Sequence, residues 1–506
     1  MANTKEKVEF GDFQTPLALA SEVVSSLEID KFETIIEPTC GLGRFLCACE
    51  TLRKTNINII GWEINPAYVN NANTELQNIT SRDETFVRQQ DFFEIDWKDV
   101  KKKFQKPILF IGNPPWVTNS ELGKLLSKNL PKKYNFKGLN GLDAMTGKSN
   151  FDISEWMLIK IAEFISKTNS AMAFLIKTSV ARKIFTHICK NNLSVGNFFI
   201  KGIDEKKHFN VNVDACLFFA QGIIDNKKNK NNKICKIYSS LHSEKPCKEM
   251  GLSNNKLISD INSYKPLMDI DSKCEFKWRS GVKHDCSKVM EFAKKGDMFV
   301  NGFNEAYFLP NSFIYPMYKS SNISKSVLSP PIKYMMITQK KIGEETRFIK
   351  ITSPLTWEYL EAHAEKLDAR KSSIYKNSPR FSMFGVGNYT FKPWKVAISG
   401  LYKNIKFSLV GLYNDKPVVF DDTCNMLGFD QKSEALFVYE VLTSDIAKKF
   451  IDSLVFKDNK RPITVALLNR ISIEFISKKL GMHDEYKKLF SNHKPKQLSL
   501  FNEYNK

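Results

Sequence analysis

The chain has 506 residues, enough for two or three domains that each bury a full core. Its formal net charge of +20, with 75 Lys and Arg against 55 Asp and Glu, favours a polyanionic partner such as nucleic acid, although a lysine-rich genome would produce the same excess. The ten cysteines form no CxxC pair, and neither a signal peptide nor a run of ~20 apolar residues is present, which excludes a disulfide framework, a zinc site, secretion and a membrane span. We therefore expect a cytoplasmic protein without a metal or a membrane partner.

Residues 30–220 alternate short β-branched runs with amphipathic helical segments, and this pattern predicts a largely parallel α/β sheet. The predicted strands are 34–36, 57–62, 85–87, 108–111 and 171–176, with 198–200 and 215–219 as a closing pair. The predicted helices are 43–54, a segment through Tyr68 and Ala72, and 153–165. Ligands bind beyond the carboxyl ends of such strands, so the residues that follow each strand are the candidates for a site.

Three of these strands are followed by residues suited to a nucleoside. The first is followed by Glu37-Pro38-Thr39-Cys40-Gly41-Leu42-Gly43, in which the glycines permit a tight turn at a helix N-terminus. Glu63 and Ile64 follow the second strand, where an acid can accept hydrogen bonds from ribose hydroxyls. Asp91 and Phe92 follow the third, combining an acceptor for an adenine amino group with an aromatic face.

The fourth strand ends in Asn113-Pro114-Pro115-Trp116, which suits the binding of a planar amine. The Asn113 side-chain oxygen and the Pro114 carbonyl can both accept hydrogen bonds from one exocyclic amino group, and the prolines restrict the backbone that carries them. Trp116 offers a face for stacking on the base. Taken alone, the tetrapeptide is also compatible with an ordinary turn at a strand end. The four strand ends together favour a nucleoside-binding site.

These motifs, in this order, resemble the gamma-class (TaqI-type) adenine-N6 DNA methyltransferases, which use S-adenosylmethionine. The resemblance covers roughly residues 10–220 and implies a Rossmann-like class I methyltransferase sheet followed by a C-terminal α+β target-recognition domain. It differs from the commoner motif in having Trp116 in place of Tyr or Phe. We accordingly expect a methyltransferase domain over 1–222, a linker or transition over 223–270, a DNA-binding domain over 271–480 and a tail over 481–506.

The resemblance also assigns roles to individual residues. It implies catalytic roles for Asn113, Pro114, Pro115, Trp116 and, packing against the flipped base, Phe209. It implies cofactor contacts for Phe13, Thr15, Pro16, Glu37, Pro38, Cys40, Gly41, Gly43, Glu63, Ile64, Asp91, Phe92 and Asn113. The polar segment 119–150 directly follows the catalytic turn and is either a loop that closes on DNA or a disordered stretch.

The second half of the chain interleaves basic and aromatic residues, as in 276–286 and 315–319 and around Arg370, Tyr375 and Trp394. This pattern suits phosphate contacts combined with base readout, although a folded domain with a basic surface would show it too. We interpret His284 as structural. The predicted partner is double-stranded DNA, and we expect a stand-alone bacterial modification enzyme; whether a separate restriction endonuclease accompanies it is left open by the sequence.

Two other classes of function stay open from the sequence. The same turn serves adenine in RNA, cytosine N4 and the glutamine amide of proteins, so the acceptor could differ. A non-catalytic DNA-binding specificity protein would keep the fold without the chemistry. The large basic second half favours DNA, and the four strand ends favour catalysis.

The C-terminal segment Gln497-Leu498-Ser499-Leu500-Phe501 carries a separate hypothesis. It resembles the peptide by which bacterial replication and repair proteins bind the sliding clamp, with Gln497 in one pocket and Leu500 and Phe501 in another. The alternative is that its apolar side chains dock back on the recognition domain.

Overall fold

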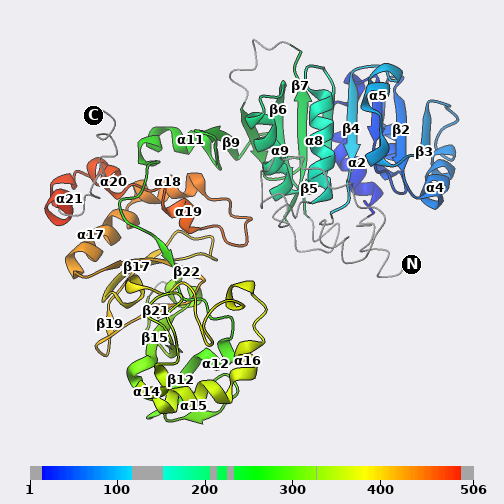
Figure 1. The fold of residues 1–506 in the computed structure, drawn as a ribbon. Helices are drawn as coiled ribbons and strands as arrows, with labels where there is room; N and C mark the ends of the chain where they lie inside the picture. Colours follow the sequence, from blue (N-terminus) through cyan, green and yellow to red (C-terminus); the bar gives the residue numbers. More distant parts are fainter. Residues whose placement is uncertain (1–13, 117–151, 205–213, 225–232, 326, 492–506) are drawn as a thin grey trace, which may run out of the picture. The chain divides into compact units, whose positions relative to one another are not determined.

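The computed structural model describes residues 14–116, 152–204, 214–224, 233–325 and 327–491. The chain forms two compact units, Met1–Asn262 and Ser263–Lys506 (Figure 1). No helix in the described ranges has the length and apolar character needed to cross a membrane.

The N-terminal unit is built on one sheet of ten strands in the order β10-β9-β8-β6-β7-β5-β4-β1-β2-β3. The strands are β1 (Thr34–Glu37), β2 (Asn58–Glu63), β3 (Thr85–Gln89), β4 (Ile108–Gly112), β5 (Ala171–Lys177), β6 (Val195–Gly202), β7 (Ala215–Gly222), β8 (Ile234–Tyr238), β9 (Lys248–Ser253) and β10 (Lys256–Ile258). The five adjacent strands β3, β2, β1, β4 and β5 run parallel, whereas β7 lies antiparallel between β5 and β6. The predicted strands and the closing pair are therefore confirmed, and the structure shows that the pair is antiparallel.

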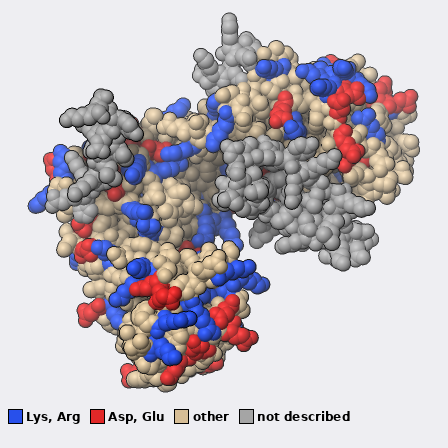
Figure 2. All heavy atoms as spheres, viewed as in Figure 1, with Lys and Arg blue, Asp and Glu red and all other residues tan. Residues whose placement is uncertain are grey.

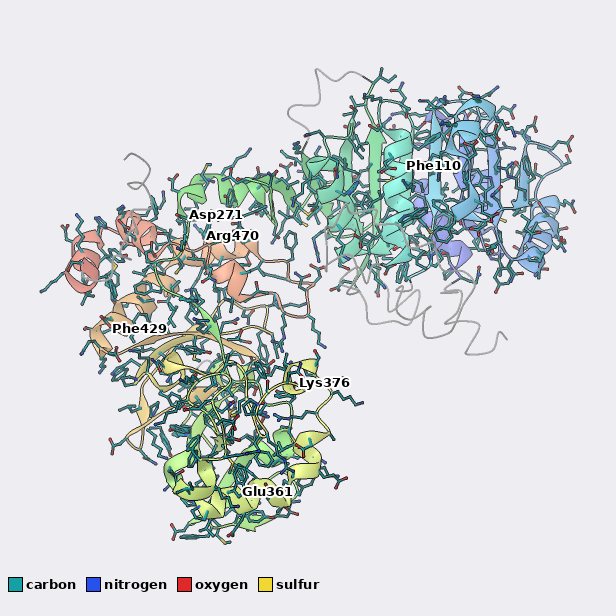
Figure 3. The ribbon with its side chains drawn as sticks, viewed as in Figure 1. Phe110, Asp271, Glu361, Lys376, Phe429 and Arg470 are labelled. Carbon is teal, nitrogen blue, oxygen red and sulfur yellow. The ribbon has the colours of Figure 1, made fainter. Side chains whose placement is uncertain are left out.

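Helices cover both faces of this sheet, which explains why its central strands are apolar on both sides. The helices are α2 (Leu17–Ser25), α3 (Arg44–Leu52), α4 (Pro66–Gln77), α5 (Trp97–Lys103), α8 (Ile153–Ile165) and α9 (Thr178–Lys190). Ile35 and Leu109 belong to a core with α2, α3 and α4. On the opposite face, Phe110 packs against Trp97 of α5 and Phe164 of α8 (Figure 3). Successive residues along a strand point to opposite faces of the sheet, so each strand contributes side chains to both apolar layers.

The strand order reverses between β1 and β4. β2 and β3 lie on one side of β1, whereas β4 and β5 lie on the other. A parallel sheet opens a crevice where its order reverses, because the connections leave in opposite directions. The glycine turn after β1 and the Asn-Pro-Pro-Trp turn after β4 therefore emerge side by side.

The predicted transition segment, 223–270, adds three strands to this sheet. β8 pairs with β6, and β9 and β10 continue outward as antiparallel strands. The division between the units follows Asn262, and not residue 222. These outer strands are short, and each contains a lysine, so their sequence lacks the long apolar runs that mark the central strands.

The C-terminal unit combines helices with sheets that are antiparallel except for the parallel pair β15 and β21. A six-stranded sheet has the order β14-β13-β12-β16-β15-β21, and a four-stranded sheet has the order β11-β22-β17-β18. Its strands are β11 (Arg279–Ser280), β12 (Glu291–Lys295), β13 (Met298–Val300), β14 (Ala306–Tyr307), β15 (Ile314–Tyr318), β16 (Lys333–Met336), β17 (Trp394–Ser399), β18 (Phe407–Val410), β19 (Leu412–Tyr413), β20 (Lys416–Pro417), β21 (Val419–Phe420) and β22 (Cys424–Phe429). This is the expected α+β architecture.

Helices of this unit lie in its middle and at its end. They are α11 (Ile261–Tyr264), α12 (Ser287–Met290), α13 (Ser320–Ile323), α14 (Ile349–Thr352), α15 (Pro354–Ala362), α16 (Ala364–Asp368), α17 (Lys432–Thr443), α18 (Asp445–Leu454), α19 (Val465–Leu468), α20 (Ile473–Lys479) and α21 (His483–Phe490). Asp271 fixes the incoming chain to these helices by accepting two hydrogen bonds from Arg470, at 3.0 and 2.6 Å (Figure 3).

Candidate active site

The Asn113–Trp116 turn is directly preceded by Gly112, a glycine that the sequence analysis did not identify as a site residue. Gly112 ends β4 with φ +148°, a backbone conformation that L side chains rarely adopt. A β-carbon added there would lie 3.1 Å from Cγ of Glu37, which ends the neighbouring β1. Gly112 thus allows the chain to turn sharply into Asn113 while the two strand ends remain in contact.

Asn113 is held by the segment that precedes α2. Its amide nitrogen donates to Oγ1 of Thr15 at 3.2 Å, across 98 residues of sequence. Because the nitrogen and the oxygen of a side-chain amide lie in one plane at a fixed angle, this bond also fixes the direction of the Asn113 side-chain oxygen. Pro16 follows Thr15 as the N-cap of α2. The structure therefore brings together two elements that lie far apart in the sequence, and their expected contacts with a cofactor stay predictions.

Trp116 closes the turn against β5. Its side chain is 7% exposed, and its indole nitrogen donates to the carbonyl of Leu175 at 3.3 Å. Its own carbonyl accepts a hydrogen bond from Nζ of Lys177 at 3.2 Å. The stacking role expected for Trp116 stays a prediction, and its described contacts anchor the turn.

The glycine turn after β1 is held by the acid after β2. Glu63 accepts hydrogen bonds from the backbone nitrogens of Gly41, at 2.8 Å, and Asn65, at 2.9 Å. Gly41 and Gly43 have φ values of +50° and +71°, and Gly43 caps α3. The nitrogen of Gly43 donates to the carbonyl of Cys40 at 2.7 Å. Glu63 thus orders the turn whose backbone faces the crevice.

Gln14 contributes to the same turn and was missed as a site residue. Its side-chain oxygen accepts from the nitrogen of Leu42 at 3.2 Å. A β-carbon on Gly41 would lie 2.8 Å from the Gln14 amide atoms, so the glycine makes room for this close approach. The position of Gln14 directly before Thr15 was the available signal.

Glu37 is a buried carboxyl group at the base of the site. It is 3% exposed, and its Oε2 has no hydrogen-bond partner among the described residues. Burial, together with the nearby carboxyl of Glu63, raises the pKa of Glu37 well above its usual range. Such an acceptor is available to a ligand group that carries hydrogen-bond donors.

Asp91 follows β3 and caps a short helix by accepting from the nitrogen of Phe93 at 2.8 Å. Phe92 is 4% exposed and packs edge-on against Trp97 and Trp156, with ring centroids 5.5 and 6.0 Å away. Its neighbour Phe93 is only half-buried. In the described structure Phe92 is a core residue, and its expected cofactor contact stays untested.

The remaining predicted residues fall into two groups. Pro38 and Cys40 are buried within the glycine turn, and Ile64 is half-buried after β2. Phe13, Phe209, segment 119–150 and Gln497–Phe501 lie outside the described residues. The described residues also contain no group of three or more His, Cys, Asp or Glu arranged to hold a metal ion.

Many basic and aromatic residues of the C-terminal unit bind the protein itself. Arg380 pairs with Glu361 and Asp368, each at 3.0 Å, and Lys395 is buried and donates to the carbonyl of Lys392. Figure 2 shows Lys and Arg on this unit interspersed with Asp and Glu. These residues are therefore engaged within the protein itself.

His284 lies in a polar cluster within this unit. It is buried, its Nδ1 accepts from the nitrogen of Cys286 at 3.2 Å, and its Nε2 lies 3.5 Å from Glu291. Lys319 also donates to Glu291, at 2.6 Å. These contacts agree with the structural role expected for His284.

The fold and the site define a Rossmann-like methyltransferase with an appended α+β domain. The profile of the N-6 DNA methylase family matches residues 1–176. The Type II methyltransferase M.NspV of Nostoc sp. is 44% identical over 479 residues, covering 94% of this chain and 98% of that protein. M.VspI of Vibrio sp. is 23% identical over 322 residues, covering 62% and 71%.

Among solved structures, the Type IIL restriction-modification enzyme MmeI in complex with DNA has a similar fold. The TM-score is 0.54 at 14% identity, over 92% of this chain and 65% of MmeI. The identity and coverage shared with M.NspV extend through both units. The chain belongs to the N-6 DNA methylase family of type II methyltransferases.

Proposed function

We propose that the protein transfers a methyl group from S-adenosylmethionine to N6 of adenine in double-stranded DNA, as the modification enzyme of a restriction-modification system. The observation that carries this proposal is the Asn113–Trp116 turn at the strand reversal. Its amide is oriented by Thr15, and its other end is bound to β5. The turn thereby presents fixed acceptors beside the glycine turn.

The catalytic contribution of these residues is positional. The amine of adenine is unreachable inside a duplex, so the base must leave the stack before it can enter the site. The Asn113 oxygen and the Pro114 carbonyl then accept hydrogen bonds from the amine and point its lone pair at the methyl carbon. This arrangement lowers the barrier by restricting geometry, and it needs no catalytic histidine.

The residues at the crevice fit the proposed cofactor. Glu63, Asp91 and the buried Glu37 supply acceptors, and Gly41 keeps the turn free of a side chain. When bound, S-adenosylmethionine supplies a sulfonium-bound methyl group: the amine lone pair forms the N–C bond, the S–C electron pair passes to sulfur, and the amine loses one proton to solvent. The residues of the chain bind the cofactor, orient the amine and exclude water from the site.

The acceptor is tested by offering the protein several substrates. With radiolabelled S-adenosylmethionine, we expect label in duplex DNA, recovered as N6-methyladenine after digestion, and none in RNA or in a release-factor protein. Recovery of N4-methylcytosine, or label in RNA or protein, would replace adenine in DNA as the acceptor. If calorimetry detects no binding of S-adenosylmethionine or S-adenosylhomocysteine, the non-catalytic alternative is favoured.

DNA contact is proposed for segment 371–379 of the C-terminal unit. Arg370 holds the segment by donating to the carbonyls of Leu367, at 2.7 Å, and Ser382, at 2.8 Å, and its guanidinium lies 3.7 Å from the ring centroid of Tyr375. Lys371 and Lys376 are exposed (Lys376 is labelled in Figure 3), and within the described ranges neither forms an ion pair. A segment that Arg370 holds in place and that carries two exposed lysine side chains is suited to binding phosphate.

Two protein partners complete the proposal. A separate endonuclease would cleave the same sequence when it is unmethylated, and expression of this protein would then protect DNA from it. Gln497–Phe501 would attach the enzyme to a bacterial sliding clamp. A 492–506 peptide is expected to bind a clamp with micromolar affinity, about −8 kcal/mol, and to lose binding on Phe501→Ala. Absence of clamp binding by the intact protein would remove this partner alone.

A further inference from the structure

The Asn113–Trp116 turn is anchored by hydrogen bonds to residues outside it. Pro114 and Pro115 have no backbone N–H, so neither can anchor the turn by donating a hydrogen bond. The acceptor carbonyl of Pro114 therefore depends on fixed points on either side. On the Asn113 side these are the Thr15 bond and the Gly112 conformation.

Lys177 provides a fixed point on the other side. It is the last residue of β5, and its Nζ donates to the carbonyl of Trp116 at 3.2 Å. Two residues earlier on the same strand, the Leu175 carbonyl accepts from the Trp116 indole at 3.3 Å. Main chain and side chain of Trp116 are thus both bound to the end of β5, which itself pairs with β4.

Asp152 orients the Lys177 ammonium. Its Oδ2 lies 2.7 Å from Nζ of Lys177, and the two side chains are 7% and 21% exposed. The other oxygen, Oδ1, caps α8 by accepting from Ser154. Trp116 and Asp152 are the described residues on either side of 117–151, so one ammonium binds both. A partly buried pair of this kind adds little net stability, which leaves geometry as its main contribution.

We infer that Lys177 is a positioning residue for methyl transfer, acting on the catalytic turn through the Trp116 carbonyl with Asp152 as its orienting partner. This inference rests on the proposed function. Nζ keeps the turn at a set distance from β5 and thereby keeps the Pro114 carbonyl aligned with the Asn113 amide. Without the bond, the amine would be held by one well-placed acceptor instead of two.

The test compares two lysines whose ion-pair partners are buried carboxylates at the start of α8, Asp152 at its N-cap and Glu155 in its first turn. Lys183 of α9 pairs with Glu155 of α8 at 2.8 Å, as Lys177 pairs with Asp152, but no described contact joins Lys183 to the turn. Lys177→Met is expected to lower kcat on duplex DNA about 10- to 100-fold, while the KM for S-adenosylmethionine changes by less than about threefold. Lys183→Met should retain the wild-type kcat within about threefold.

Conservative variants separate positioning from folding. Lys177→Arg keeps the charge and the donors and should recover most of the kcat, whereas Lys177→Gln, which is too short to reach both partners, should not. If Lys177→Met does not fold, the Gln and Arg pair decides the question alone. Equal losses in the Lys177→Met and Lys183→Met variants, or an unchanged kcat in folded Lys177→Met and Lys177→Gln, would overturn the inference. An inactive wild-type protein would instead reject the proposed function.

Discussion

The two units use their polar residues differently. In the N-terminal unit, where the strand order reverses, Thr15 holds Asn113, Glu63 holds the glycine turn, and Glu37 is buried at the end of β1. In the C-terminal unit, Arg380 and Lys395 are bound to neighbouring protein groups. Motif order thus marked elements that the structure brings together, whereas an abundance of basic and aromatic residues does not show which of them are bound to the protein itself.

The strongest test of the crevice is Asn113→Ala. Loss of one positioned acceptor is expected to lower kcat on the order of a hundredfold or more while cofactor binding, followed by calorimetry, persists. Thr15→Val should show a smaller loss, because it removes only the group that orients the amide. Full activity in Asn113→Ala would reject the mechanism.

Gly112→Ala tests whether contact between strand ends defines the site. The added β-carbon would meet Glu37 at a φ that alanine rarely adopts, at a cost of roughly 1–3 kcal/mol. We expect both a lower melting temperature and about a tenfold or greater loss of activity. Gly296→Ala is the control, since Gly296 has φ +59° and no atom within 4 Å of the added carbon. It should cost stability alone.

DNA binding should distinguish the exposed lysines of segment 371–379 from Arg380, which is paired within the protein. Lys376→Ala and Arg380→Ala remove the same charge, but Arg380 is already paired with Glu361 and Asp368. Lys376→Ala should weaken DNA binding and reduce the slope of log affinity against log salt by about one, and Lys371→Ala with Lys376→Ala by about two. Arg380→Ala should leave this slope unchanged. Equal slopes in the Lys376 and Arg380 variants would count against segment 371–379 as a phosphate contact.

The last prediction concerns Lys395 and affects stability without affecting activity. Burial lowers the pKa of its ammonium to about 7, from 10.5 for an exposed lysine. Between these values the unfolded chain binds more protons than the folded one, so stability should rise with pH from about 7 towards 10, by at most about 1.4 kcal/mol per pH unit. Lys395→Met should remove this rise. Denaturant unfolding at pH 7 and 9 measures it, and an identical pH dependence in both proteins would contradict the prediction.

The sequence predicted the central strands and the residues that follow them because parallel strands carry long apolar runs. It did not predict the three outer strands β8, β9 and β10, which are short and whose apolar residues are interrupted by or adjoin lysine. Lys177 was not predicted as a site residue for another reason. Its partners, Trp116 and Asp152, lie 61 and 25 residues away, and only the assembled sheet brings them together.

The hydrogen bond between Thr15 and Asn113 has a consequence for the order of folding. It joins residues 98 positions apart, so during synthesis Thr15 leaves the ribosome long before its partner exists. The bond also requires β4 to have paired with β1, a long-range closure that comes late in the folding of a parallel sheet. Secondary structure should therefore return first after dilution from denaturant, and methyl transfer only after the chain has closed this loop.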